Sequence, residues 1–109
     1  MEIKDIPFQV FDLESEEPEE HAGLTGKAYW KTIKRGNVRI RIVEYTPGYL
    51  ADHWCEKGHA LFVLDGEFES ELKDGRKNRL TKGMCYLVAD NAEPHRSYTK
   101  EGVKLLIVD

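Results

Sequence analysis

The sequence is poor in cysteine, lacks an excess of positive charge and contains no long apolar run. Its two cysteines, Cys55 and Cys85, are too few for a disulfide framework and favour free thiols or metal ligands in a reducing compartment. The net charge of -4 argues against a nucleic-acid partner, which would require a basic surface. No apolar run approaches the ~20 residues of a membrane span, and Met1–Asp5 lacks the basic and apolar regions of a signal peptide. We therefore expect a cytoplasmic protein that binds neither nucleic acid nor membrane.

The chain is long enough for one compact domain with a hydrophobic core. It has 109 residues, of which 40% are hydrophobic and 33% charged, as in soluble globular proteins. The segment Glu14–Glu20 is acidic, contains a proline and has no apolar residue, which predicts a solvated loop.

From Lys27 onward the pattern is that of β-strands, and no segment has a helical period with caps. Apolar and polar residues alternate in Val38–Ile42 and Glu67–Leu72, as in strands with one buried face. Asp65-Gly66 and Asp74-Gly75 predict hairpin turns. Many short strands separated by turns predict an all-β sandwich or barrel.

Two arginines and the second cysteine also have residue-level predictions. Arg39 and Arg41 lie on one face of a predicted strand, where we expect solvent; if that face lines a cavity, they would bind an anionic substrate. Cys85 lies in a predicted core strand and is expected to be a buried, small hydrophobic residue.

Three of the four histidines lie after Gly48 and are spaced like metal ligands. His53 and Cys55 are two residues apart, which places both on one face of an extended strand. His59 begins the next strand, and His95 begins a strand that a closing barrel brings across from His53. Imidazole and thiolate bind divalent transition metals such as zinc, iron and nickel. The alternative is that these are ordinary buried polar residues with hydrogen-bond partners.

Two segments resemble the motifs of the cupin family. The segment from Gly48 through His53, Cys55 and His59 to Gly66 is similar to the first cupin motif, and Gly83–His95 is similar to the second. Asp52-His53-Trp54-Cys55 resembles, more narrowly, the small bacterial cupins named after a DHCW motif. The resemblance covers Gly48 to about Thr99.

This resemblance implies a cupin-type conical β-barrel (a double-stranded β-helix or jelly roll) with a metal inside. Residues 1–109 then form a single domain, with an N-terminal strand and acidic loop in 1–27 and the barrel in 28–109. His53 and His95 match the first and last motif histidines, Cys55 stands in place of the second histidine, and His59 stands in place of the glutamate. The implied ligands are the three histidines, with Cys55 as a fourth ligand or a thiol beside the metal.

The function expected from these features is that of a small metal-binding cupin acting on a small molecule. A metal-dependent enzyme of the oxygenase or isomerase type is the first hypothesis, and no acid–base residue is identifiable for it. A non-catalytic module that binds a small ligand or a metal is the alternative, and a structural metal comes third. The resemblance also implies a homodimer.

Overall fold

The computed structural model describes residues 2–109, and Met1, the first residue of the predicted N-terminal segment, lies outside the described residues. It is an all-β fold with one 3-10 turn, η1 (Leu13–Ser15), and no α-helix among residues 2–109. None of these residues belongs to a helix long and apolar enough to cross a membrane. The strands in chain order are β1 (Glu19–Ala22), β2 (Lys27–Arg35), β3 (Val38–Tyr45), β4 (His59–Leu72), β5 (Lys77–Thr81), β6 (Cys85–Val88), β7 (His95–Tyr98) and β8 (Val103–Val108). The all-β prediction is confirmed.

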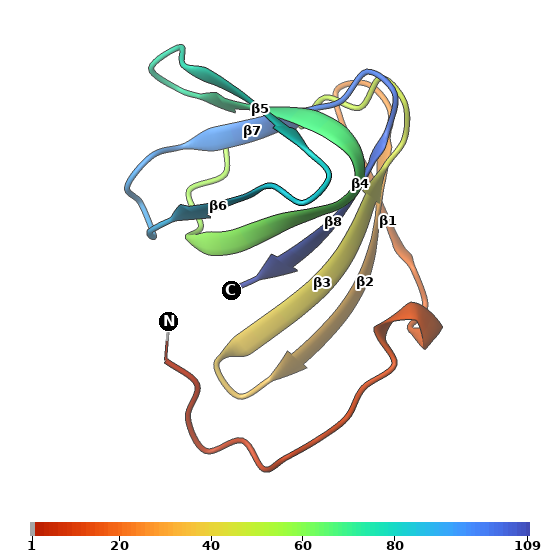
Figure 1. Ribbon diagram of the computed structural model, residues 1–109, viewed down its shortest axis with the longest axis vertical. Coiled ribbons are helices and arrows are strands. Elements are labelled where there is room, and N and C mark those ends of the chain that lie inside the picture. Colours follow the sequence, from red (N-terminus) through yellow and green to blue (C-terminus); the bar gives the residue numbers. More distant parts are fainter. Residues whose placement is uncertain (1) are drawn as a thin grey trace.

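All strand pairs are antiparallel, and the long strand β4 joins two sheets (Figure 1). The sheet order is β1-β2-β3-β8-β4, so the last strand lies between two strands from the middle of the chain. The first half of β4 pairs with β8 and β6, whereas its second half pairs with β5 and β7. The interior between these two sheets therefore receives side chains from both halves of β4.

The predicted hairpin turn at Asp65-Gly66 is wrong, because β4 continues through these residues. Its pairing with β8 shifts by one residue between Val63 and Asp65, which is a β-bulge. Gly66 has φ +79°, and a Cβ there would lie 2.5 Å from the Gly102 carbonyl oxygen. The bulge bends the strand from one sheet into the other without reversing it. The predicted hairpin at Asp74-Gly75 does connect β4 to β5, and that prediction is confirmed.

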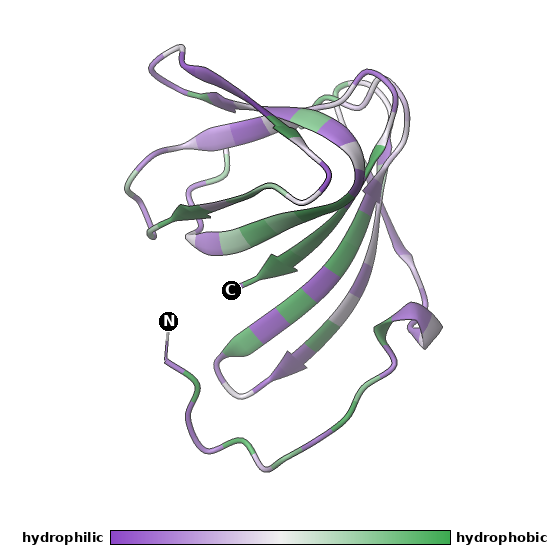
Figure 2. Ribbon diagram, viewed as in Figure 1, coloured by the Kyte–Doolittle hydropathy of each residue, from purple (hydrophilic) through white to green (hydrophobic). Residues whose placement is uncertain are grey.

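Alternation along β3, β8 and β4 places successive rows of side chains across the interior. The first two rows are largely apolar and belong to the hydrophobic core, which Figure 2 shows as green bands on β8 and the first half of β4. The third row is polar and lies at the end of the sheet. From the registers of these strands, the rows are Val43–Leu105–Val63, then Arg41–Ile107–Leu61, then Arg39–Asp109–His59.

Two local predictions are corrected. Glu19 and Glu20 belong to β1 and pair with β2, so the acidic run is a loop only in part; an edge strand lets acidic side chains stay in solvent while the backbone is paired. Cys85 is exposed, because β6 is a four-residue strand in which Cys85 and Leu87 point away from the interior.

Candidate metal site

The segment that carries His53 and Cys55 does not form a continuous strand. Within it, Cys55 makes one isolated bridge with His95: the Cys55 N–H donates to the His95 carbonyl at 2.7 Å, and the His95 N–H donates to the Cys55 carbonyl at 3.0 Å. His53 lies in a bend, its side chain is 72% exposed, and its Nδ1 donates to Asp52 Oδ1 at 2.6 Å. The alternation argument for His53 and Cys55 therefore fails, because it holds only for a regular strand.

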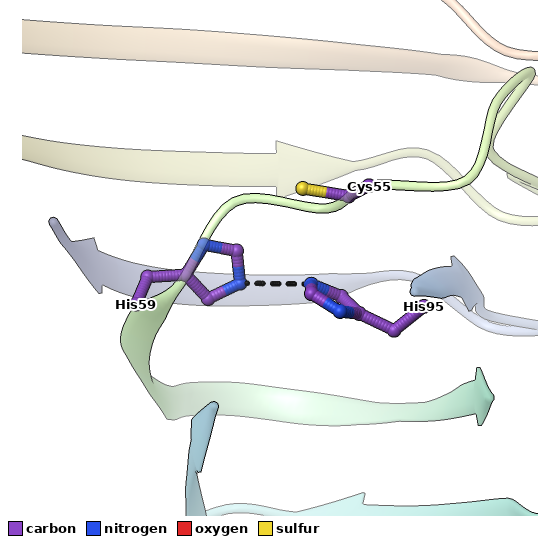
Figure 3. Close-up of side chains that lie close together, drawn as sticks. All are labelled: Cys55, His59 and His95. Atoms are coloured by element: carbon purple, nitrogen blue, oxygen red, sulfur yellow. Dashed lines mark hydrogen bonds between the residues drawn. The ribbon is translucent and has the colours of Figure 1, made fainter. Parts of the chain in front are cut away.

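Three of the four predicted ligands come together in the interior. Cys55, His59 and His95 each offer one ligand atom, and these atoms lie within 4.8 Å of one another. His59 begins β4 and His95 begins β7, and both rings are buried. Figure 3 shows the Cys55 sulfur beside the two imidazoles, which approach each other edge to face. His53 is not part of this group.

The orientation of the two imidazoles fits a shared cation. The Nδ1–H of His95 donates to the Glu93 carbonyl at 2.8 Å, which leaves the lone pair on Nε2. This Nε2 lies 3.2 Å from the Nε2 of His59. Two imidazole nitrogens on a tetrahedral zinc ion, each ~2.0–2.1 Å from it, are about 3.3 Å apart. The separation of the two nitrogens therefore suits a metal bound between them.

The other nitrogen of His59 supports the same interpretation. His59 Nδ1 is buried without a hydrogen-bond partner among residues 2–109, and the nearest acidic atom is Asp109 Oδ2 at 3.6 Å. A proton on Nδ1 would face this carboxylate and leave the Nε2 lone pair directed at His95. Carboxylates commonly orient metal-binding histidines in this way.

Burial and neighbouring charges set the protonation of the three groups. The adjacent His95 lowers the pKa of the Cys55 thiol, and Cys55 in turn raises the pKa of His95. Burial, together with the nearby His95, lowers the pKa of His59 to about 4. At neutral pH His59 is therefore a neutral imidazole, the form that binds metals, and the lowered pKa of Cys55 favours the thiolate, whereas the raised pKa of His95 favours its protonated form, so that a metal would have to displace a proton there.

Sequence reasoning missed Asp109, which is the central acidic residue of this region. Its side chain is 2% exposed and accepts hydrogen bonds from Arg39 Nε at 2.8 Å, Arg39 Nη2 at 3.0 Å and Arg41 Nη2 at 3.2 Å. The signal was present in the alternation of β8, because Val103, Leu105 and Ile107 point inward and Asp109 is the next position in that series.

The expectation that Arg39 and Arg41 are solvated is also wrong. Arg41 is 5% exposed and Arg39 is half-buried, because both occupy the inward-facing rows of β3. Together with Cys55, His59 and His95 they line a cavity of about 270 Å³, whose other walls include Trp30, Tyr45, Tyr49 and Tyr86. A larger hollow of about 560 Å³ between β5 and β6 reaches His95 but neither Cys55 nor His59.

Tyr86 is a second residue that the sequence did not single out. Its hydroxyl lies 3.0 Å from His59 Nε2. Burial raises the pKa of this phenol, which therefore keeps its proton and is available as a hydrogen-bond donor in the cavity.

Neither a protein-family model nor a curated protein sequence matches this chain. Solved structures do. A predicted oxalate decarboxylase from Thermotoga maritima has a TM-score of 0.77 at 15% identity, covering 92% of this chain and 96% of its own. A sugar phosphate isomerase of the cupin superfamily from Silicibacter pomeroyi has a TM-score of 0.69 at 17% identity, covering 92% and 74%. A cupin domain from Schizosaccharomyces pombe has a TM-score of 0.72 at 15% identity, covering 91% and 71%.

At these low identities the likeness establishes the fold and not the activity. The similarity extends over nine tenths of the chain and so includes the strands on both sides of the two motifs. The jelly-roll prediction is confirmed: the chain has the cupin fold.

Proposed function

We propose that this chain is a small cupin that binds a divalent transition metal through Cys55, His59 and His95 and takes a small molecule into the adjoining cavity. The observation that carries the proposal is the convergence of two buried imidazole nitrogens, 3.2 Å apart, with a cysteine sulfur. A soft thiolate and two imidazoles favour zinc, iron or nickel over calcium or magnesium.

A bound metal would supply a Lewis acid that polarises an oxygen of the small molecule. The chain itself contributes the positioning. The Glu93 carbonyl fixes the His95 ring by a hydrogen bond, and the Asp109 carboxylate faces Nδ1 of His59. The Tyr86 hydroxyl lies beside Nε2 of His59.

Metal uptake tests this proposal. Metal-free protein titrated with Co(II) is expected to bind one ion per chain and to show the absorption of a cobalt–thiolate bond. Cys55→Ser should abolish that absorption, and His59→Gln or His95→Gln should weaken binding about tenfold or more, as losing even an outer partner commonly does. Cys85→Ser is the matched control, since Cys85 is exposed outside this group, and should behave as the native protein. Retention of the thiolate band by Cys55→Ser, or far less than one ion per chain in the native protein, would contradict the proposal.

His53 as a further ligand stays a prediction. Its ring lines the cavity but lies outside the group of three and donates to Asp52. Coordination by His53 would require the segment around it to move inward. The same Co(II) titration of His53→Gln decides the matter, because a true ligand gives a weaker complex with an altered visible spectrum.

Two roles fit a metal and a small molecule in one cavity. A metal-dependent enzyme of the oxygenase or isomerase type is the first, and it is supported by the cavity beside these residues and by two structural neighbours that are named as enzymes, one of them as a predicted one. A non-catalytic binding module is the second, and it is favoured because neither of two ionisable groups at the site is a free base. Asp109, next to the cavity, is ion-paired with Arg39 and Arg41, and Tyr86 in its wall keeps its proton. Turnover of a bound compound that disappears in His95→Ala identifies the enzyme, and binding without turnover identifies the module.

We also propose that the protein works as a homodimer in the cytoplasm. Phe62 and Leu87 are 41% and 82% exposed on the outer side of the paired strands β4 and β6, and a second copy would cover them. Both cysteines are unpaired, and a thiol used as a ligand suits a reducing compartment.

A further inference from the structure

Two of the arginines that line the cavity beside Cys55, His59 and His95 depend on the same acidic partner. Asp109 is the acidic partner of both Arg39 and Arg41. Arg39 makes two hydrogen bonds to this carboxylate: its Nε donates to Oδ1 and its Nη2 donates to Oδ2. Arg41 reaches it through Nη2 alone, at 3.2 Å. Two guanidinium groups therefore share one carboxylate, and Arg41 makes the weaker contact with it.

Most of the hydrogen-bonding capacity of Arg41 is unused. A guanidinium has five N–H donors, and the bond to Asp109 is the only one that Arg41 makes within residues 2–109. The side chain is 7% exposed, and its Nε is buried with no partner. An unpaired buried charge is costly unless a partner is supplied. A ligand with negative charge would supply it.

The walls of the cavity hold Arg41 in place for such a ligand. Its guanidinium lies over the Trp30 ring, 4.6 Å from the centroid, so the group is fixed from one side by a cation–π contact. Tyr45, Tyr49 and Tyr86 form further walls, while His59 and His95 lie on the same cavity. A molecule held by Arg41 would therefore lie in the same space as the metal ligands.

The chemistry and the space select a small carboxylate. The planar guanidinium fork matches the two oxygens of a carboxylate. A volume of about 270 Å³ corresponds to roughly nine water volumes, which suits a small molecule. We propose that Arg41 is the carboxylate-binding residue of this cavity and that its ligand is a small carboxylic acid in its anionic form. This inference rests on the proposed function in taking the cavity as the place where a small molecule binds.

Calorimetry with acetate tests the inference in metal-free and in Co(II)-loaded protein. Acetamide is the matched neutral probe, because it has the same shape without the charge, and inorganic phosphate probes another oxyanion. Acetate is expected to bind and acetamide is not. Arg41→Gln should weaken acetate binding about tenfold or more, the usual worth of a hydrogen bond to a charged group. Arg79→Gln, an exposed arginine on β5, is the control and should bind acetate as the native protein does.

Each outcome decides the inference. Equal binding of acetate and acetamide, phosphate binding as tight as acetate, no acetate binding, or unchanged binding in Arg41→Gln would overturn it. The comparison of the probes on the native protein keeps the test valid if Arg41→Gln fails to fold. Acetate binding without Co(II) uptake would contradict the proposed metal site and leave the role of Arg41 standing. Co(II) uptake without acetate binding would overturn the role of Arg41 and leave the proposed metal site standing.

Discussion

At the scale of single residues, the buried imidazole of His59 makes the stability of the protein depend on pH. Desolvation of the ring, reinforced by the adjacent His95, lowers its pKa from 6.5 to about 4 in the folded protein. The unfolded chain then takes up a proton at His59 at pH values where the folded chain does not. This difference links the stability of the metal-free protein to pH.

The predicted effect is a loss of stability on acidification. Because the folded pKa is depressed, the free energy of unfolding falls as pH drops from about 6.5 towards 4. His59→Gln removes this dependence, so between pH 7 and pH 5 the native protein should lose about 1–2 kcal/mol more than the variant. Urea unfolding of the metal-free proteins at both pH values measures the difference. The exposed His53 gives a control, since His53→Gln should keep the pH dependence of the native protein; identical pH dependence in native protein and His59→Gln would disprove the assignment.

At the scale of elements, the bend in β4 decides whether the site exists. The first half of the strand begins at His59, and its second half pairs with β7, which begins at His95. The bulge between Val63 and Asp65, next to Gly66, turns one half of the strand over the other and so brings these two histidines into the same interior.

Gly66→Ala is predicted to destabilise the fold strongly. The residue has φ +79°, and an added Cβ would meet the backbone oxygen of Gly102 at 2.5 Å, where no flexible side chain can move away. We expect a loss of about 2–4 kcal/mol in the free energy of unfolding, from left-handed strain plus the displaced backbone. Gly75→Ala is the matched control: Gly75 has φ +100° with open space around it, so only the strain of roughly 1 kcal/mol applies. Equal losses in the two variants would show that the close approach to Gly102 does not matter.

At the scale of the whole molecule, the outer surface contrasts with the polar end of the interior. Phe62 and Leu87 expose apolar side chains over β4 and β6, while the N-terminal segment exposes Ile3, Phe8 and Val10. We propose that residues 1–109 act as one domain, with residues 1–27 preceding the barrel of 28–109, and that β4 and β6 form the dimer surface.

The oligomeric state provides the test at this scale. The native protein is expected to have twice the mass of one chain in light scattering. Leu87→Lys should weaken the dimer about tenfold or more, because it places a charge in the buried centre of the contact. Leu24→Lys changes another exposed leucine, outside β4 and β6, and should leave the dimer intact. A monomeric native protein, or equal effects of the two lysines, would contradict this surface.

The sequence by itself determined the all-β class and the hairpin at Asp74-Gly75, and it singled out His53, Cys55, His59 and His95 as candidate ligands; its resemblance to the cupin motifs implied the cupin fold. The strands and the turn follow from local rules: the period of two in a strand and the conformations that a turn requires. The inward position of Asp109 could also have been predicted, because it continues the alternation of β8.

Only the tertiary structure decided which of these residues meet. The separation of His53 from Cys55 depends on the irregular backbone between β3 and β4, which pairs with β7 only through isolated bridges, Leu50 with Tyr98 and Cys55 with His95. The burial of Arg41 depends on which face of β3 the second sheet covers. Alternation gives two faces without saying which is inside, and the partner strands that settle it are far away in the sequence.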